Sequence, residues 1–363
     1  MLRPLLYLIC SILFCNAPGS SIKTRNINSV SIETIVQDST LNVRAIEIVQ
    51  LTDRDNACIF LTSDGRFGSI FSSAFVSSFD DSEFGIHMVD LKTDSIRPNF
   101  RALAASYNNG FGITIGSPAL IYKLDADLEK NKIVYRDNHP KAFYDAMAFW
   151  NKNEGLAIGD PTDGCMSILI TRDAGENWEK LPCDKLPKAI DGEAAFAASD
   201  TNIAIVGDHT WVATGGKVSR ILFSADKGHS WTVYETPIVQ GKETTGMYSI
   251  DFYDDLYGFA IGGDYTNPDD NMANKIRTED GGKTWTIVGA GKDPGYRSCI
   301  QYVPNGHGQE LVAVGFKGID YSRDGGKRWK HLSDEGFYTI RFLNDSIAYA
   351  AGKGKVSKLL FRE

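Results

Sequence analysis

The chain has 363 residues, of which 42% are hydrophobic and 11% aromatic, and it contains 35 glycines. A chain of this length can bury a large core or close a repeat array, and its glycine-rich composition favours many short strands. The formal net charge of −8 and the lack of any basic stripe argue against nucleic-acid binding.

The first twenty residues have the pattern of an export signal. Arg3 precedes an apolar run from Leu5 to Phe14, which is too short for a stable transmembrane helix. We therefore expect a signal peptide over residues 1–20 and an exported protein that is periplasmic, secreted or tethered to the outer membrane. Lipidation at Cys15 stays open, because Phe14 is larger than the residue that usually precedes a lipidated cysteine.

A strand pattern with a small residue, an apolar residue, a variable residue and usually an aromatic one recurs along the chain. A second strand follows each copy and mostly ends in glycine, as in "LAIG" and "FAIGG". The seven copies of the first strand are "AIEI" at 45, "ALAA" at 102, "AMAF" at 146, "AAFA" at 194, "SIDF" at 249, "CIQY" at 299 and "TIRF" at 339. This spacing is close to the ~40 to 50 residues of a four-stranded propeller blade. The sequence thus predicts one all-β domain over residues 21–363, a seven-bladed β-propeller with four-stranded antiparallel blades.

Four turns, which we call the Asp turns, share the pattern Ser/Thr, then Asp two residues on, Gly four on and Trp seven on. They read "TRDAGENW" at 171, "SADKGHSW" at 224, "TEDGGKTW" at 278 and "SRDGGKRW" at 322. The Asp carboxylate can accept backbone N–H groups a few residues ahead, and Gly supplies a positive φ. The Trp ring is suited to burial between sheets. We therefore assign structural roles to Asp173, Trp178, Asp226, Trp231, Asp280, Trp285, Asp324 and Trp329.

The two ends of the chain predict how the ring closes. The seventh unit ends at "KVSKLLFRE", which supplies only a third strand, and "SVSIETIV" at residues 29–36 alternates polar and apolar residues with no first strand before it. We expect this N-terminal strand to complete the last blade, because closure removes exposed sheet edges.

The Asp turns resemble the Asp-box or BNR repeats of sialidases and sortilin-type propellers. The unit "FYDAMAFWNKNEGLAIGDP", with its Asp turn, resembles the photosystem II stability/assembly-factor-like repeat. Closer still, "AIGDPTDGCMSI" and "DGEAAFAAS" resemble an exported propeller family of Bacteroidetes-type bacteria, labelled oxidoreductase or BNR-repeat glycosyl hydrolase. The resemblance covers the whole predicted domain and implies a propeller of the WD40/YVTN-like kind. It implies that the first strands begin at the ligand mouth, with the Asp turns on the opposite rim.

The candidate ligand-binding residues lie just before each first strand or just after the glycine of each second strand. They are Arg44, Arg101, Asp145, Glu193 and Tyr248 in the first position, and Asp160, Asp208, His209, Asp264 and Tyr265 in the second. Equivalent positions elsewhere hold Ser298, Tyr338 and Phe316. Ion pairing or solvation of these charges is the competing interpretation. Asp160 precedes Pro161 and is equally suited to closing a turn. Convergence of Asp160, Asp208 and Asp264 on Ca²⁺ lacks a contiguous ligand loop, so no metal is expected.

These residues favour a binding or assembly module that holds a protein, a glycan or another polar ligand at the channel mouth. A sialidase-like glycoside hydrolase is the alternative, with Asp145 and Glu193 as catalytic candidates. Arg44 and Arg101 supply only two arginines, and "SIRPNF" has the wrong order for the sialidase signature. No G-x-G-x-x-G or C-x-x-C supports an oxidoreductase. We expect no cofactor and a monomer.

Two cysteines, Cys165 and Cys183, flank the first Asp turn symmetrically about Ala174. Opposed positions on paired strands lie close enough for a bridge, and an exported protein meets oxidising conditions. We expect a disulfide, with two free thiols as the alternative. Cys58 and Cys299 fall within apolar strands as buried thiols.

Overall fold

The computed structural model describes residues 24–52, 55–72, 84–91, 97–106, 109–125 and 131–363. The expected signal peptide over residues 1–20, with Cys15, lies outside this part. Apart from a short 3₁₀ helix, Cys183–Lys185, the described elements are β-strands. Among the described residues, no helix has the length and apolar character needed to span a bilayer.

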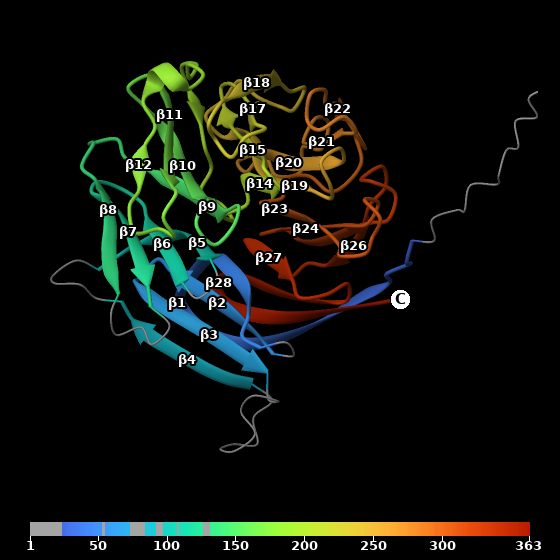
Figure 1. Ribbon diagram of the computed structural model, residues 1–363. Coiled ribbons are helices and arrows are strands. Elements are labelled where there is room, and N and C mark those ends of the chain that lie inside the picture. The colour runs from blue at the N-terminus through green and yellow to red at the C-terminus, as the bar shows by residue number, and fades with distance from the viewer. Residues whose placement is uncertain (1–23, 53–54, 73–83, 92–96, 107–108, 126–130) are drawn as a thin grey trace, which may run out of the picture.

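Six antiparallel sheets stand in a ring around a central axis (Figure 1). Four of them have four strands each. They comprise β5 (Phe100–Ser106), β6 (Asn109–Thr114), β7 (Ala119–Leu124) and β8 (Lys132–Asp137); β9 (Tyr144–Phe149), β10 (Gly155–Thr162), β11 (Cys165–Thr171) and β12 (Glu179–Lys180); β14 (Ile203–Val206), β15 (His209–Ala213), β17 (Arg220–Ser224) and β18 (Thr232–Glu235); and β23 (Cys299–Tyr302), β24 (Leu311–Gly315), β25 (Gly318–Ser322) and β26 (Lys330–Ser333).

The other two sheets have six strands each. One has the order β13-β16-β19-β20-β21-β22, with β13 (Glu193–Ala194), β16 (Gly215–Gly216), β19 (Thr245–Phe252), β20 (Gly258–Asp264), β21 (Lys275–Thr278) and β22 (Thr286–Ile287). The other has the order β27-β28-β1-β2-β3-β4, with β27 (Thr339–Phe342), β28 (Ile347–Arg362), β1 (Ser29–Gln50), β2 (Asn56–Thr62), β3 (Arg66–Ser72) and β4 (Phe84–Asp90).

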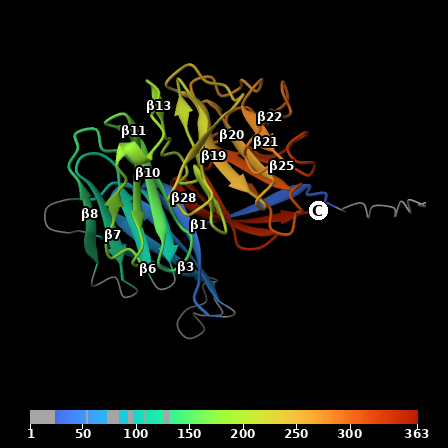
Figure 2. The ribbon, with the colours of Figure 1, turned by 45° about the horizontal axis from the view of Figure 1, so that its top comes forward.

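The N-terminal strand joins the sheet of the last repeat, as the sequence predicts. Strand β1 pairs with β28 from Ser29↔Arg362 to Asn42↔Lys353, and then with β2 from Val43↔Thr62 onward. The first and last strands of the chain therefore lie side by side (Figure 2). The expected count of seven separate blades is wrong, because the 22-residue β1 belongs to both the last and the first repeat and fuses them into one sheet. Six sheets result, and not all of them have four strands.

The middle strands of the sheets are largely buried, whereas the outermost strands are more exposed. All seven residues of β11 are buried, because a strand between two packed sheets is covered on both faces. The outer strands "EK" (β12) and "KHLS" (β26) carry exposed charged residues, Glu179 and Lys330 among them. Charged outer strands of this kind discourage pairing with other chains.

The fourth repeat departs from the predicted strand assignment. The first strand expected at residue 194 is only the two-residue β13, which pairs with β16 outside the central ring. The innermost position is taken by β14, which the sequence pattern assigns as a second strand. The close pairing of β13 needs glycine, because Gly216 has φ +94° and a Cβ there would lie 2.2 Å from the carbonyl oxygen of Gly192.

Residues 195–202, which we call the channel segment, leave the sheet and fill the central channel. The carboxylate of Asp200 accepts the N–H groups of Leu103 on β5 (2.8 Å) and Met147 on β9 (3.1 Å). The Ser199 hydroxyl donates to the carbonyl of Ser298 at 2.6 Å. Thr201 Oγ1 donates to Ser249 Oγ at 2.7 Å. The segment is thus bonded to several inner strands at once and closes the channel.

The four Asp turns share the hydrogen bonds of their Asp and Ser/Thr side chains, and three of them share the indole bond, which Trp178 in the first turn lacks. In the third, Asp280 Oδ1 accepts the N–H of Thr284 at 2.9 Å, and the N–H of Gly282 donates to Thr278 Oγ1 at 2.9 Å. Gly282 has φ +83°, in the left-handed region that favours glycine. The indole of Trp285 is 7% exposed and donates to the Gly282 carbonyl at 2.9 Å. These bonds use the polar atoms of the turn within the hairpin itself.

The expected disulfide between Cys165 and Cys183 is present, with a Cα–Cα distance of 5.5 Å. It joins the start of β11 to the 3₁₀ helix, whereas the sequence prediction placed both cysteines on opposed strands. Cys58 and Cys299 are buried free thiols.

Candidate functional site

A cavity of about 500 Å³, the mouth cavity, lies where the inner strands begin. Its lining comes from the starts of inner strands, from the loops beside them and from the channel segment. It is lined by Arg44, Arg101, Phe143, Phe196, Ala197, Ala198, Glu243, Tyr248, Tyr265, Tyr296, Ser298, Phe316 and Tyr338. Four of the predicted ligand-binding residues, Arg44, Arg101, Tyr248 and Tyr265, meet there.

The charged residues that line the mouth cavity are Arg44, Arg101 and Glu243. Arg44 Nη1 donates to the carbonyl of Ala198 at 3.3 Å, and its guanidinium carbon lies 4.4 Å from the centre of the Tyr338 ring. The buried Nε of Arg44 has no hydrogen-bond partner, and neither has the buried Nε or Nη1 of Arg101. Within the described residues, neither arginine has a carboxylate at ion-pair distance.

Burial lowers the pKa of both guanidinium groups, and repulsion by Arg44 adds to the shift of Arg101. Burial, followed by the positive charge of Arg44, lowers the pKa of Arg101 to about 10. Burial also lowers the pKa of Arg44. Two guanidinium groups that are partly desolvated, close together and short of acceptors form a site that favours an anion.

Aromatic rings form one wall of the mouth cavity. Tyr248 stacks on Phe196, with ring centres 4.0 Å apart, and meets Tyr296 edge-on at 4.8 Å. Tyr296 in turn lies 5.4 Å from Phe316. The rim residues Tyr265 and Phe316 are 49% and 44% exposed. Such a wall offers apolar contact surface beside the guanidinium groups.

Sequence reasoning found only part of this wall. Tyr338, Phe316 and Ser298 occupy repeat positions equivalent to those of the predicted residues, and this equivalence was the available signal. Phe196 and Tyr296 were missed. Phe196 belongs to the channel segment, which the pattern assigns to a strand, and Tyr296 lies in a loop before β23.

Two predicted acids stand apart from the mouth cavity. Asp145 is 0% exposed on β9, and neither of its oxygens has a hydrogen bond of normal geometry. Glu193 is 4% exposed and forms an ion pair with Arg220, with Oε2 2.6 Å from Nη2. It also accepts the hydroxyl of Thr214 at 2.8 Å. The pair of catalytic carboxylates that a glycosidase requires is therefore not assembled by Asp145 and Glu193.

Asp160 lies in a second cavity, of about 720 Å³, at the mouth end of the β9-β12 sheet. Its Oδ1 accepts the N–H of Ala195 at 2.9 Å. Burial raises the pKa of Asp160 to about 6, against the effect of this hydrogen bond. Glu193 also lines this cavity, together with His139 and Asp163.

Asp208, His209 and Asp264 do not line the mouth cavity. Asp208 follows β14, at the end of that strand away from the mouth, and its carbonyl accepts the N–H of Lys227 in an Asp turn. His209 packs there against Trp211, with ring centres 5.7 Å apart. Asp264 is 4% exposed and accepts both the N–H (2.9 Å) and the hydroxyl (2.6 Å) of Thr266, which closes a turn. The three acids considered for Ca²⁺ therefore do not converge.

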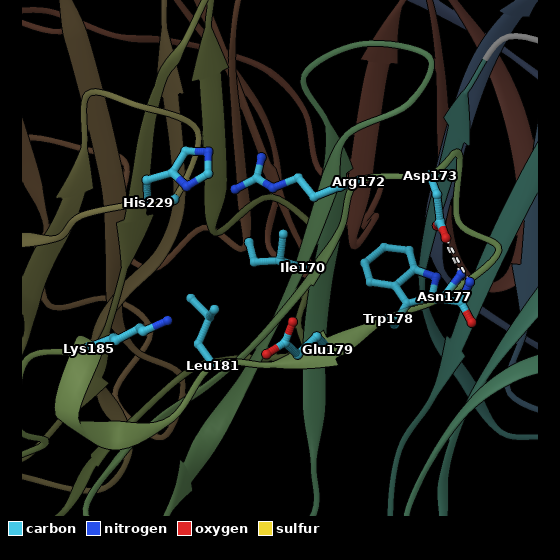
Figure 3. Close-up of a pocket in the computed structure, with 10 residues that line it drawn as sticks. Ile170, Arg172, Asp173, Asn177, Trp178, Glu179, Leu181, Lys185 and His229 are labelled. Carbon is cyan, nitrogen blue, oxygen red and sulfur yellow. Dashed lines mark hydrogen bonds between the residues drawn. The ribbon is translucent and has the colours of Figure 1, made fainter.

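A third cavity, of about 420 Å³, lies beside the first Asp turn (Figure 3). Ile170 and Leu181 stand between Arg172, His229 and Lys185, and the carboxylate of Asp173 bonds the side chain of Asn177 at its edge. Arg172 is paired with Glu154 at 2.8 Å. Arg172 is therefore less available to a ligand than the arginines of the mouth cavity.

No family model and no curated protein matches the chain. Among solved structures, YCF48 bound to D1 peptide aligns with a TM-score of 0.60 at 13% identity, covering 94% of this chain and 100% of that one. The WD40 repeats of RRP9 give 0.60 at 11% identity over the same shares. YCF48 from Cyanidioschyzon merolae gives 0.58 at 12%, covering 92% and 99%. The chain is thus a β-propeller similar in structure to YCF48 and to WD40-repeat proteins.

Proposed function

We propose that the protein is a binding or assembly module that holds a protein partner or another polar ligand at the mouth cavity. The observation that carries this proposal is the set of unpaired, buried N–H donors on Arg44 and Arg101. A buried donor without a partner costs about 1 to 3 kcal/mol. A ligand that supplies acceptors recovers this free energy on binding.

The mouth cavity fits an anionic group of the ligand in particular. Guanidinium groups match the geometry of carboxylates and bind them more strongly than they bind neutral acceptors. The aromatic wall of Tyr248, Tyr296 and Phe316 gives apolar surface beside that position. Aromatic and arginine side chains are the residues that contribute most to protein interfaces. The similarity to a propeller structure bound to a peptide supports a protein partner.

Related features of the chain are part of the same proposal. We propose that the protein is exported, as the N-terminal pattern indicates, that it acts as a monomer, and that its seven sequence units represent seven repeats of a BNR-type propeller, two of them joined through β1. A glycan remains a ligand class that the mouth cavity accommodates. No contact in the described residues favours a hydrolase or an oxidoreductase.

A matched pair of arginine variants tests the proposed site. Tyrosine fluorescence or NMR titration with acidic and neutral peptides of equal length reports ligand binding near Tyr248 and Tyr296. We expect the acidic peptide to bind and Arg101→Ala to weaken that binding at least tenfold. Arg172→Ala removes an equally charged side chain at the Asp-turn end and is expected to leave binding unchanged. Equal binding of both peptides to the parent and to Arg101→Ala would exclude the mouth cavity as the site.

A further inference from the structure

The buried carboxyl of Asp145 does not line the mouth cavity, but Arg101, which does, lies on the adjacent inner strand. Arg101 is the second residue of β5, and Asp145 is the second residue of β9. Both strands are the innermost of adjacent sheets, and they pack against each other. The two side chains therefore start from equivalent positions at the mouth end of neighbouring strands.

Asp200 of the channel segment fixes the alignment of these strands. Its two carboxylate oxygens accept the N–H of Leu103 at 2.8 Å and the N–H of Met147 at 3.1 Å. Leu103 and Met147 follow Arg101 and Asp145, respectively, by two residues. Arg101 and Asp145 therefore lie two residues closer to the mouth end of their strands than Leu103 and Met147 do. Arg101 is the extra residue of a bulge between Phe100 and Ala102, and Asp145 is the extra residue of a bulge between Tyr144 and Ala146, so the two residues share the same irregular strand position.

Asp145 and Arg101 are both short of partners. Among the described residues, the oxygens of Asp145 have no hydrogen bond of normal geometry, the buried Nε and Nη1 of Arg101 have no partner, and the two groups are not in ion-pair contact. They do interact electrostatically: the charge of Arg101 favours ionisation of Asp145, and the charge of Asp145 favours protonation of Arg101. Two unpaired charges of opposite sign at neighbouring positions each partly offset the electric field of the other.

We propose that Asp145 is the internal counter-charge of Arg101 and that, whenever its carboxyl is ionised, it lowers the affinity of the mouth cavity for anions. This inference rests on the proposed function, because it concerns the regulation of the same site. Asp145 would act as a positioning and tuning residue, since no bound molecule can touch a fully buried side chain. The mouth cavity would then take up a proton together with an anionic ligand.

The groups that face Asp145 determine when its carboxyl ionises. Burial and then the negative charge of Asp160 raise the pKa of Asp145, and Arg101 and the backbone N–H of Ala197 oppose this shift. Above its raised pKa the carboxyl is charged and opposes a bound anion; below it the carboxyl is neutral and the field of Arg101 acts alone. Affinity for anions is therefore expected to rise as the pH falls.

Benzoate is a suitable probe, because it carries one carboxylate and one aromatic ring and stays ionised above about pH 5. Calorimetric titration would compare the full-length parent with Asp145→Asn, Arg101→Ala and Asp251→Asn at about pH 5.5 and about pH 8. Asp251→Asn is the matched control. Asp251 is another inner-strand aspartate, but its carboxylate accepts the N–H of Tyr302 at 2.7 Å in strand β23.

We expect the parent to bind benzoate more tightly as the pH falls, by at least threefold across the ionisation of Asp145. Asp145→Asn should lose this dependence and, at the higher pH, bind at least threefold more tightly than the parent. Asp251→Asn should behave as the parent does, and Arg101→Ala should bind weakly at both pH values. The pH profile of the unmodified protein and its proton uptake in buffers of different ionisation enthalpy provide a test that needs no variant.

Two unfavourable results are distinct. If Arg101→Ala abolishes binding while Asp145→Asn binds no more tightly than the parent at high pH, the role of Asp145 is wrong and the anion site stands. If benzoate and acidic peptides fail to bind the parent at either pH, the anion site is wrong and the role of Asp145 is overturned with it.

Discussion

Glu193 and Arg220 form a buried ion pair, with Glu193 Oε2 2.6 Å from Arg220 Nη2 and both side chains no more than 9% exposed. Glu193 precedes the channel segment, and Arg220 begins β17. The pair therefore joins the start of the channel segment to the neighbouring sheet. This contact gives Glu193 a structural role where the sequence suggested catalysis or ligand binding.

Breaking this pair should lower stability without affecting ligand binding. Glu193→Ala leaves Arg220 buried without its carboxylate, and the removal of one partner of a buried pair costs about 3 to 5 kcal/mol. Urea unfolding followed by tryptophan fluorescence measures the loss. Glu179→Ala, at an exposed position of β12, is the control and should change little. An unfolding free energy equal to that of the parent would show that the pair is dispensable.

The protein should not hydrolyse glycosides. A panel of chromogenic α- and β-glycosides, including a sialoside, would be incubated with purified protein, and release of the chromophore measured. No release is expected, because Asp145 is fully buried and Glu193 is held by Arg220. Hydrolysis that disappears in Asp145→Asn or Glu193→Gln would restore the hydrolase interpretation.

The Asp turns should contribute to stability alone. Asp280→Ala removes acceptors for the N–H of Thr284 and for the hydroxyls of Thr284 and Thr278. We expect a loss of about 1 to 3 kcal/mol in unfolding free energy, measured by chemical denaturation. Peptide or benzoate affinity at the mouth cavity should stay the same. A folded variant that loses this affinity would contradict the structural assignment of the Asp turns.

Removal of the N-terminal strand should open the ring. Deletion of residues 24–36 exposes the edge of β28 and removes the ion pair between Arg25 and the buried Glu310, 2.9 Å apart. Open strand edges pair with other chains, so we expect aggregation and a broad, non-cooperative thermal transition. Light scattering and calorimetry test this, and a truncated protein that melts like the parent would argue against closure by β1.

Stability should depend on pH through Asp251. Burial raises the pKa of this carboxyl to about 6 in the folded protein, against about 3.9 in an unfolded chain. The folded state therefore binds the proton more tightly, so the contribution of Asp251 to stability is largest below the unfolded pKa and declines as the pH rises to about 6. Asp251→Asn should reduce the change of the melting temperature with pH over that window. An unchanged profile would show that Asp251 ionises normally.

The local elements of this fold could be predicted from the sequence because each is specified by neighbouring residues. The Asp turns need only an acceptor, a glycine with positive φ and a following tryptophan, all within eight residues of one another. The repeated strands and the pairing of the N-terminal strand with the last repeat follow from hydrophobic patterns in the same way. The Cys165–Cys183 bridge could be anticipated because the two residues lie symmetrically about a turn.

Only the tertiary structure decided how the strands are shared and what the mouth contains. The alternation of apolar residues could not show that β1 serves two repeats, since one continuous strand and two short ones have the same pattern. Nor could it show that residues 195–202 leave their sheet, because the bonds of Ser199, Asp200 and Thr201 reach strands 48 to 140 residues away. Such long-range contacts decide whether a charged side chain is buried, paired or open to a ligand. They place Arg44 and Arg101 in the mouth cavity, whereas Glu193 is paired with Arg220 and Asp208 lies outside the cavity.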